Sequence, residues 1–450
     1  MPPAVAGGDN PGVATEMTAA TETAGALSAF PRDSALSARG RLEVGGCDVI
    51  ELAREFGTPA YVVAEDDLRD RAQAALAAGR DAGQRDFHVA FASKAFPCTA
   101  VLELFAREGL WCDVASGGEL HLALNAGFHP ERILLHGNAK SQDELTQAVE
   151  AGVALIVLDG MQEIDRLAAL LGQGVPVRGD AAAAQQVLVR VTPDVRGETH
   201  EKISTGQANS KFGFSMQSAS EALARVAEVP RLALAGVHAH IGSQLTELEP
   251  FRREIAQLSG LGSFAVWDLG GGLGVRYTAG QPEPPSIEEY ARTLVSCAHE
   301  HGIGADARML IEPGRSLVAN ACVTLYTVES VKQNVSRWVA VDGGMSDNLR
   351  PMLYGAPYEA QVADRFGGRD RCVLAGKHCE SGDVIVADAL LSDPRPGDVI
   401  VTPATGAYGY AMANNYNGVP RPPVIFCRGG DARVVVRRET FEDLTARDVR

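Results

Sequence analysis

The sequence of 450 residues lacks any apolar run long enough to cross a membrane. Its first residues also lack the basic start and the following apolar stretch of a secretory signal peptide. These absences argue against a membrane-spanning or secreted protein. Residues 1–41, whose first thirty or so are rich in Ala, Gly and Thr, are expected to form a disordered N-terminal extension.

The eight cysteines form no CxxC pair and no regular framework. A disulfide-bonded scaffold is therefore not expected, and the pattern favours the reducing cytoplasm. The 41 Lys and Arg residues are outnumbered by 57 Asp and Glu residues and form no basic block. This distribution argues against nucleic acid as a partner and favours a small polar substrate.

Between residues 66 and 316, short β-rich apolar runs alternate with segments of helical period, as in βα units around a parallel sheet. Eight such runs are present, and eight strands predict a closed TIM-type (β/α)8 barrel. The runs are FHVAFA from Phe87, LWCDVA from Leu110, RILLHG from Arg132, ALIVLD from Ala154, QVLVRV from Gln186, LAGVHAH from Leu234, FAVWDLG from Phe264 and RMLIEPG from Arg308.

A second, all-β domain is predicted over residues 317–450, where short alternating strands and tight turns replace the βα pattern. The strand-like AYVVAE within residues 42–65 is expected to join this β domain. The predicted strands are VTLYTV, RWVAVDGG, RCVLAG, DVIVADALL, GDVIVTPA, PPVIFC and ARVVVRR.

Polar residues and glycines gather where the barrel strands end. Because the carboxyl ends of barrel strands form one face, these residues predict an active site there. They are Lys94 after the first run, Ser116 to Gly118 after the second, Asn138 after the third, Arg190 at the end of the fifth, His240 and Ser243 after the sixth, Gly270, Gly271 and Gly272 after the seventh, and Glu312 and Arg315 after the eighth.

Lys94 follows a buried strand, where a solvated surface lysine would be out of place. A desolvated amine loses its proton more easily and can form a Schiff base. The alternative is a lysine that pairs with a carboxylate. Backbone N–H groups of the following glycine loop, DLGGGLG, are suited to a phosphate, although such clusters also form simple turns.

Glu312 and Arg315 follow the last barrel strand. A carboxylate there is suited to keep a pyridine nitrogen protonated, and the arginine to bind phosphate or a substrate carboxylate. A charged turn is the alternative interpretation. In HAHIGSQ, His238 and His240 share one strand face, which also permits a metal pair of the amidohydrolase kind. Further His and Asp ligands are missing at the other strand ends, so no metal is expected, and His240 is predicted to stack on an aromatic cofactor.

The β domain offers a second group of candidates. GKHCESGD places Cys379 beside Glu380 in a loop, which suits a proton donor next to a carboxylate that recognises an amine. RPMLYG brings Arg350 close to Tyr354, and Tyr408 lies in a loop bounded by glycines.

In order, the motifs of the chain resemble the fold type III pyridoxal 5'-phosphate decarboxylases, which have an alanine racemase-like fold. The set is most similar to the diaminopimelate decarboxylase family. The resemblance covers nearly everything from residue 42 to the C-terminus. The motifs are FASKAF, DVASGGEL, HGNAKS, STGQANSKFGF, HAHIGSQ, DLGGGLG, EPGR, RPMLYG, GKHCESGD and GAYGY.

The resemblance implies that the cofactor is attached to Lys94, with His240 on its ring face and Glu312 at its ring nitrogen. It implies a homodimer in which Cys379, the catalytic proton donor, and Glu380 enter the partner's site. Implied cofactor contacts are Lys94, His240, Ser243, Gly270, Gly271, Gly272, Glu312, Gly314, Arg315 and Tyr408. Implied substrate contacts are Arg315, Arg350, Tyr354, Glu380 and Tyr408.

The implied reaction is decarboxylation of meso-2,6-diaminopimelate at its D centre to L-lysine and carbon dioxide, the last step of lysine biosynthesis. The main alternative is a decarboxylase of ornithine, arginine or another basic amino acid. A regulatory protein that carries the cofactor on a barrel alone would lack the β domain. An alanine racemase would need a tyrosine acid opposite the lysine instead of the Cys379 loop.

Overall fold

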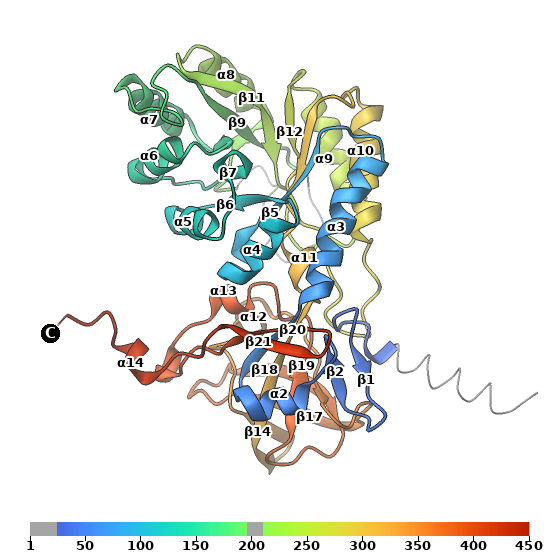
Figure 1. Ribbon diagram of the computed structural model, residues 1–450. Helices are drawn as coiled ribbons and strands as arrows, with labels where there is room; N and C mark the ends of the chain where they lie inside the picture. The colour runs from blue at the N-terminus through green and yellow to red at the C-terminus, as the bar shows by residue number, and fades with distance from the viewer. Residues whose placement is uncertain (1–24, 196–209, 450) are drawn as a thin grey trace, which may run out of the picture.

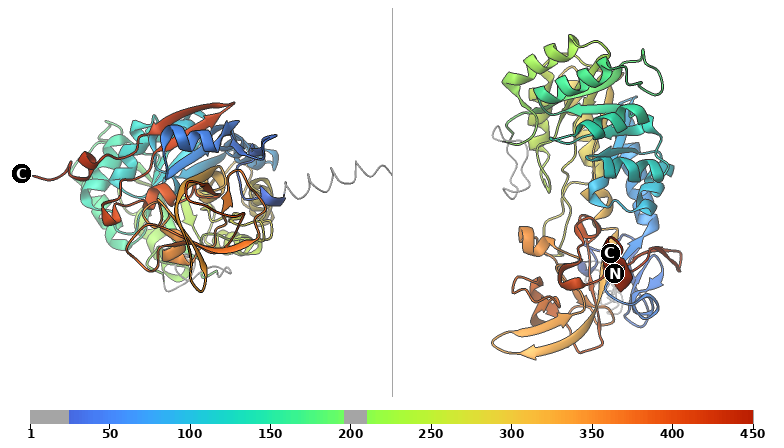
Figure 2. Two further views of the ribbon diagram at one scale, coloured as in Figure 1. Left: turned by 90° about the horizontal axis from the view of Figure 1, so that it is seen from below. Right: turned by 90° about the vertical axis from the view of Figure 1, so that its left-hand side faces the viewer.

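The computed structural model describes residues 25–195 and 210–449 and contains a barrel and a sheet domain (Figure 1). The two parts form two lobes stacked end to end (Figure 2). None of the described helices has both the length and the apolar character needed to cross a bilayer.

Eight parallel strands close into a barrel in the order β5-β6-β7-β8-β9-β11-β12-β13, and β13 pairs with β5. Each of the eight runs expected from the sequence is one of these strands, which confirms the predicted barrel. The strands are β5 (Phe87–Ala92), β6 (Trp111–Val114), β7 (Ile133–Leu135), β8 (Leu155–Leu158), β9 (Gln185–Thr192), β11 (Leu232–Ala239), β12 (Val266–Asp268) and β13 (Arg308–Ile311). The short strand β10 (Phe214–Ser215) pairs with β9.

Helices surround the barrel and cover the outer side of its strands (Figure 1). Several begin where the sequence offers a capping side chain. Ser141 and Glu144 form a capping box on α6, and Ser286 and Glu289 form one on α10. The helices are α3 (Glu65–Asp81), α4 (Thr99–Arg107), α5 (Gly117–Asn125), α6 (Gln142–Ala151), α7 (Met161–Gly172), α8 (Met216–Ala227), α9 (Glu249–Ser259), α10 (Ile287–Glu300) and α11 (Arg315–Val318).

The sheet domain contains every strand predicted after residue 317. Its strands are β14 (Cys322–Gln333), β15 (Arg337–Val341), β16 (Gln361–Val362), β17 (Asp370–Ala375), β18 (Val384–Leu391), β19 (Val399–Thr402), β20 (Val424–Arg428) and β21 (Asp431–Val436). Strand β4 (Ala60–Ala64) lies between β14 and β20 in this sheet, where the segment 42–65 was expected. The short helices are α2 (Val49–Phe56), α12 (Arg350–Tyr354), α13 (Gly409–Met412) and α14 (Phe441–Leu444).

The predicted disorder does not extend to residues 25–41. These residues include β1 (Ala35–Leu36), which pairs with β2 (Leu42–Val44), and β2 pairs in turn with β3 (Cys47–Asp48). Phe30 is only 3% exposed, and its ring lies 5.7 Å from that of Phe366. Burial of this aromatic side chain offsets the conformational entropy that the segment loses on ordering. The small and polar neighbouring residues bury too little apolar surface to do so. Residues 1–24, and residues 204–209 of the motif STGQANSKFGF, lie outside the described residues.

Candidate active site

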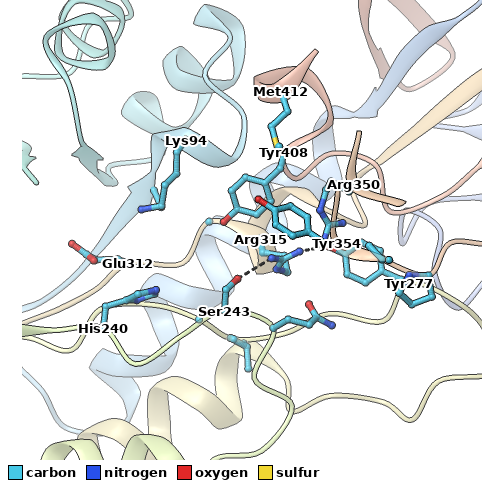
Figure 3. A pocket seen from close by; sticks show the side chains of 18 of the residues that line it. Lys94, His240, Ser243, Tyr277, Glu312, Arg315, Arg350, Tyr354, Tyr408 and Met412 are labelled. Carbon is cyan, nitrogen blue, oxygen red and sulfur yellow. Dashed lines mark hydrogen bonds between the residues drawn. The ribbon is translucent and has the colours of Figure 1, made fainter. Parts of the chain in front are cut away.

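A cavity of about 480 Å³ lies at the carboxyl ends of the barrel strands, where the sheet domain meets the barrel (Figure 3). The barrel supplies one wall and α12, α13 and the loop before α13 supply the other. Polar side chains that line it are Lys94, His240, Ser243, Gln244, Tyr277, Gln281, Glu312, Arg315, Arg350, Tyr354 and Tyr408.

The barrel interior explains how the deepest of these groups are placed. Apolar side chains such as Trp111, Leu134, Val266 and Leu310 form a buried cluster of strand residues. Because alternate residues of a strand face the same side, the residue two positions later on each strand also faces inward. These next positions hold Asp113, His136, Asp268 and Glu312, and all four are buried. An apolar layer is thus followed by a layer of acids and histidines under the cavity.

Lys94 lies in a 3-10 turn, η1 (Ser93–Ala95), directly after β5. Its Nζ is 3.0 Å from Oδ2 of Asp113, and its side chain is 50% exposed to the cavity. Burial disfavours the charged amine, but Asp113, Tyr408 and Glu312 outweigh it and raise the pKa of Lys94. These neighbouring charges oppose the effect of desolvation that was expected from the sequence, and they favour the protonated amine.

Glu312 is 6% exposed and lies between two histidines. Its Oε1 is 2.6 Å from Nε2 of His136, and its Oε2 is 3.2 Å from Nε2 of His238. Burial opposes the charge, but the two histidines outweigh it and lower the pKa of Glu312 well below its usual value. Burial above all lowers the pKa of His238 to about 4, so this ring is neutral at pH 7. The structure therefore keeps an ionised carboxylate at the floor of the cavity.

Arg315 begins the short helix α11 and is 5% exposed. Its Nη2 donates to Oγ of Ser243 over 2.8 Å, and its Nη1 donates to the hydroxyl of Tyr277. The guanidinium also lies 5.0 Å from the ring centre of Tyr408, which belongs to the sheet domain. A hydroxyl and a guanidinium on one side of the cavity form a donor set for a phosphate.

The glycine loop makes hydrogen bonds to side chains at neighbouring strand ends. Gly270 donates its N–H to Asp268 and Gly271 donates to Nδ1 of His240, so these two groups already have protein partners. A Cβ at Gly271 would lie 2.1 Å from the carbonyl oxygen of Glu312. Gly272, with φ of +117°, does line the cavity. Two of the three glycines thus join neighbouring strand ends, and the third lines the cavity.

Arg350 begins α12 and lies on the opposite side of the cavity from Lys94 (Figure 3). It is 5% exposed, donates to the hydroxyl of Tyr358 and lies 4.8 Å from the ring centre of Tyr277. Tyr354, four residues later on the same short helix, also lines the cavity. A guanidinium held by aromatic rings is a typical site for a carboxylate.

Cys379 and Glu380 are exposed. Neither is among the described residues that line the cavity. They lie in the turn between β17 and β18. His378 fixes this turn, since its Nε2 lies 2.9 Å from Oγ of Ser346. The structure therefore does not bring this predicted pair to the cavity of its own chain.

Sequence reasoning missed Asp113, His136 and Tyr277. Asp113 and His136 lie within motifs that were recognised, DVASGGEL and HGNAKS. Each lies two positions after a buried apolar strand residue. Because alternate residues of a strand face the same side, this spacing predicts that both side chains point into the barrel. Tyr277 follows the glycine loop by a few residues, and no sequence pattern marks its place between two arginines.

Comparison with known proteins agrees with this geometry. Residues 67–319 match the family described as "Pyridoxal-dependent decarboxylase, pyridoxal binding domain". Diaminopimelate decarboxylase of Bacillus subtilis is 44% identical over 91% of this chain and 95% of that protein. The enzyme of that name from Mycobacterium tuberculosis is 42% identical over 94% of this chain and 98% of that protein. The chain belongs to the diaminopimelate decarboxylase family.

Solved structures of this family have the same fold. The diaminopimelate decarboxylase of M. jannaschii superposes with a TM-score of 0.86 at 32% identity, over 94% of this chain and 98% of that one. That of Helicobacter pylori, in complex with L-lysine, gives a TM-score of 0.80 at 30% identity, over 89% of this chain and 98% of that one. The chain is accordingly a pyridoxal-dependent decarboxylase, a lyase.

The cavity fits pyridoxal 5'-phosphate. Its volume falls within the range of about 300–1,000 Å³ that is usual for small-molecule sites. The amine of Lys94 matches the aldehyde, the ionised Glu312 matches a protonated ring nitrogen, and Ser243 with Arg315 matches the phosphate. Each of these groups is a conventional partner for its part of the cofactor.

Proposed function

We propose that the chain decarboxylates meso-2,6-diaminopimelate at its D centre to give L-lysine and carbon dioxide. The observation that carries this proposal is the cavity itself, with Lys94 and Glu312 on one side and the buried Arg350 with Tyr354 on the other. The relatives of that name at 42–45% identity support the substrate, and two of the solved relatives are complexes with L-lysine.

Bound pyridoxal 5'-phosphate supplies the electron sink that accepts the electron pair left when carbon dioxide departs. Lys94 would hold its aldehyde carbon and Glu312 its ring nitrogen. The contact of Arg315 with Ser243 supports the assignment of both residues to the phosphate, together with Gly272. His240, which accepts the N–H of Gly271, would lie on the ring face.

The remaining residues orient the substrate and move a proton. Arg350 would bind the carboxylate of the distal L centre, and Glu380 would bind its amine. Cys379 would give a proton to the carbon that loses carbon dioxide, since a thiol is a suitable general acid. These assignments need Cys379 and Glu380 at the cavity.

We infer that the protein is a homodimer in which this pair enters the partner's cavity. Their position outside the cavity of their own chain supports this arrangement. Met352 and Leu353 on α12 are 44% and 37% exposed beside the cavity, and such apolar side chains are suited to an interface. A cytoplasmic location fits the eight cysteines, which are all free thiols.

A substrate panel tests the proposed substrate. Released carbon dioxide gives kcat/KM for meso-diaminopimelate, ornithine, arginine and lysine. Ornithine lacks the distal carboxylate and leaves Arg350 unpaired, which costs about 1–3 kcal/mol, or roughly tenfold to a hundredfold in specificity. Arg350→Ala should narrow that gap, whereas Arg371→Ala, at a side chain that is 78% exposed, should leave it unchanged. Ornithine equal to meso-diaminopimelate would refute the substrate assignment.

Mixed dimers test the shared site. Lys94→Ala and Cys379→Ala chains should each be inactive alone. After subunit exchange, half of the dimers would be mixed and would carry one intact site, so about a quarter of the wild-type activity should return. Differently tagged chains establish that exchange took place. If exchange is complete and no activity returns, the shared site is refuted.

A further inference from the structure

His136 faces two carboxylates with a single ring nitrogen. Its Nε2 is 2.6 Å from Oε1 of Glu312 and 3.7 Å from Oδ1 of Asp113. The other oxygen of Asp113 is 3.0 Å from Nζ of Lys94. An unbroken line of polar contacts therefore runs through the barrel interior from the amine of Lys94 to the carboxylate of Glu312.

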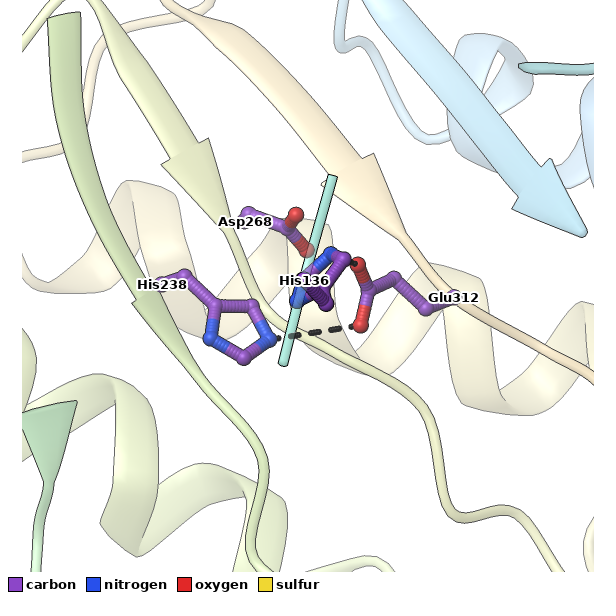
Figure 4. Close-up of side chains that lie close together, drawn as sticks. All are labelled: His136, His238, Asp268 and Glu312. Atoms are coloured by element: carbon purple, nitrogen blue, oxygen red, sulfur yellow. Dashed lines mark hydrogen bonds and ion pairs between the residues drawn. The ribbon is translucent and has the colours of Figure 1, made fainter. Parts of the chain in front are cut away.

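The group around His136 is held by ion pairs, with a hydrogen bond between His238 and Glu312, and is not arranged as a metal site. His136, His238, Asp268 and Glu312 lie close together (Figure 4). Two atoms bound to one zinc ion at 2.0–2.2 Å in a tetrahedron are roughly 3.4 Å apart. The 2.6 Å between His136 and Glu312 is shorter and falls at hydrogen-bond length.

Neither contact of His136 has the geometry of a hydrogen bond in this arrangement. An N–H on this nitrogen can turn to only one of the two carboxylates at a time. It lies nearer to Glu312, so Asp113 is left mainly to Lys94. Any change that draws Glu312 away frees the same N–H to turn toward Asp113, which would then compete with Lys94 for that carboxylate. The charges at the two ends of the cavity floor are therefore not independent.

We propose that His136 is a positioning residue that couples the charge on Lys94 to the charge on Glu312. It holds Glu312 as an oriented carboxylate beneath the ring nitrogen, and it moderates the hold of Asp113 on the lysine. This inference rests on binding of pyridoxal 5'-phosphate at Lys94, as proposed above. His136 is not among the described residues that line the cavity, and it acts through its two acidic neighbours.

Other titratable or charged side chains act on the same carboxylates from neighbouring strands and helices. They are Glu119 on α5, Arg190 on β9, His238 and His240 of the β11 motif, Glu254 on α9, Asp268 on β12 and Tyr290 on α10. None of them is in contact with both Asp113 and Glu312 among the ion pairs of the described residues. His136 alone among these pairs joins the two acids.

The test is the pH titration of the visible absorbance of the loaded protein. His136→Phe keeps a ring beside His238 but removes the N–H. Asp113 then acts on the lysine-linked chromophore without a competitor, so the titration midpoint of the chromophore should rise. Because His136 lies nearer to Glu312 than to Asp113, the rise should be up to about one pH unit, less than a full charge-assisted hydrogen bond would give. His136→Gln retains a donor and should shift the midpoint less.

A second measurement applies even to a variant that retains little pyridoxal 5'-phosphate. The rate at which the cofactor-free protein captures added pyridoxal 5'-phosphate depends on the unprotonated fraction of Lys94, so its pH profile should move upward in both His136 variants. His88→Phe is the matched control, because His88 also pairs with an acid at 2.6 Å and also lies against another aromatic ring, that of Trp111. Its two profiles should equal those of the wild type.

The outcomes separate the two proposals. A wild-type protein that forms no borohydride-reducible linkage at Lys94 would overturn the cofactor assignment itself. A wild type that forms it, with both His136 variants unmoved in both profiles, would overturn the coupling alone. One equivalent of metal in the wild type that is lost in His136→Phe would also overturn it, because a metal site would then explain the cluster.

Discussion

Asp113 forms an ion pair with Lys94, the lysine proposed to bind the cofactor, and Asp113→Asn should therefore lower the pKa of Lys94. The two groups are 3.0 Å apart. At an effective dielectric constant of about 20, charges at this distance interact by roughly 5 kcal/mol. Lys94 is half exposed to the cavity, where water screens it, so an interaction of about 1.5–3 kcal/mol is expected, or about one to two pKa units.

The capture of pyridoxal 5'-phosphate by the cofactor-free protein measures this change. Only the neutral amine attacks the aldehyde, so at a fixed pH near 8 the second-order rate constant should rise by about tenfold to a hundredfold in Asp113→Asn. Asp165→Asn removes an acid that pairs with Arg225 on the protein surface and should leave the rate unchanged. Capture by Asp113→Asn at the wild-type rate or slower would refute the view that Asp113 holds the amine as a cation.

Two further predictions concern buried acids. Glu312→Gln cannot carry the charge that faces the ring nitrogen, so kcat should fall by about a hundredfold or more in a steady-state assay, and a near-normal kcat would contradict this role. Burial above all raises the pKa of Asp347 to about 7. Because its folded pKa is higher than its unfolded one, stability should fall as pH rises from about 4 to 7, by at most about 4 kcal/mol. Melting temperatures across this range should fall less steeply for Asp347→Asn, and parallel curves would contradict the assignment.

Much of the fold could be predicted because its signals are local. The barrel strands are short apolar runs between helical segments, and each lies where its run was expected. The sheet strands after residue 317 could be predicted from short runs in which apolar and polar residues alternate. Residues 25–41 could not be predicted in this way, because their order depends on a contact between Phe30 and Phe366, which is distant in the sequence.

The candidate site shows the same difference between local sequence signals and contacts between distant residues. Lys94, Glu312 and Arg315 could be found because they follow strands, and strand ends converge at one face of a barrel. The charge of Lys94 could not be predicted, since it depends on Asp113 of the neighbouring strand rather than on burial alone. Likewise, the glycine loop could be recognised, but the sequence does not show that Gly270 and Gly271 give their N–H groups to protein side chains.

Tyr277 keeps the two arginines of the cavity apart, which matters for the proposed binding of two different anions. Its ring lies 4.8 Å from the guanidinium of Arg350 and 5.8 Å from that of Arg315. Burial opposes ionisation of this phenol, but Arg315 and Arg350 outweigh it and lower its pKa. An electron-rich ring between two cations reduces their mutual repulsion. Arg315 is thereby held toward Ser243, and Arg350 toward Tyr358 and the α12 side of the cavity, which supports the proposal that phosphate and substrate carboxylate bind different arginines.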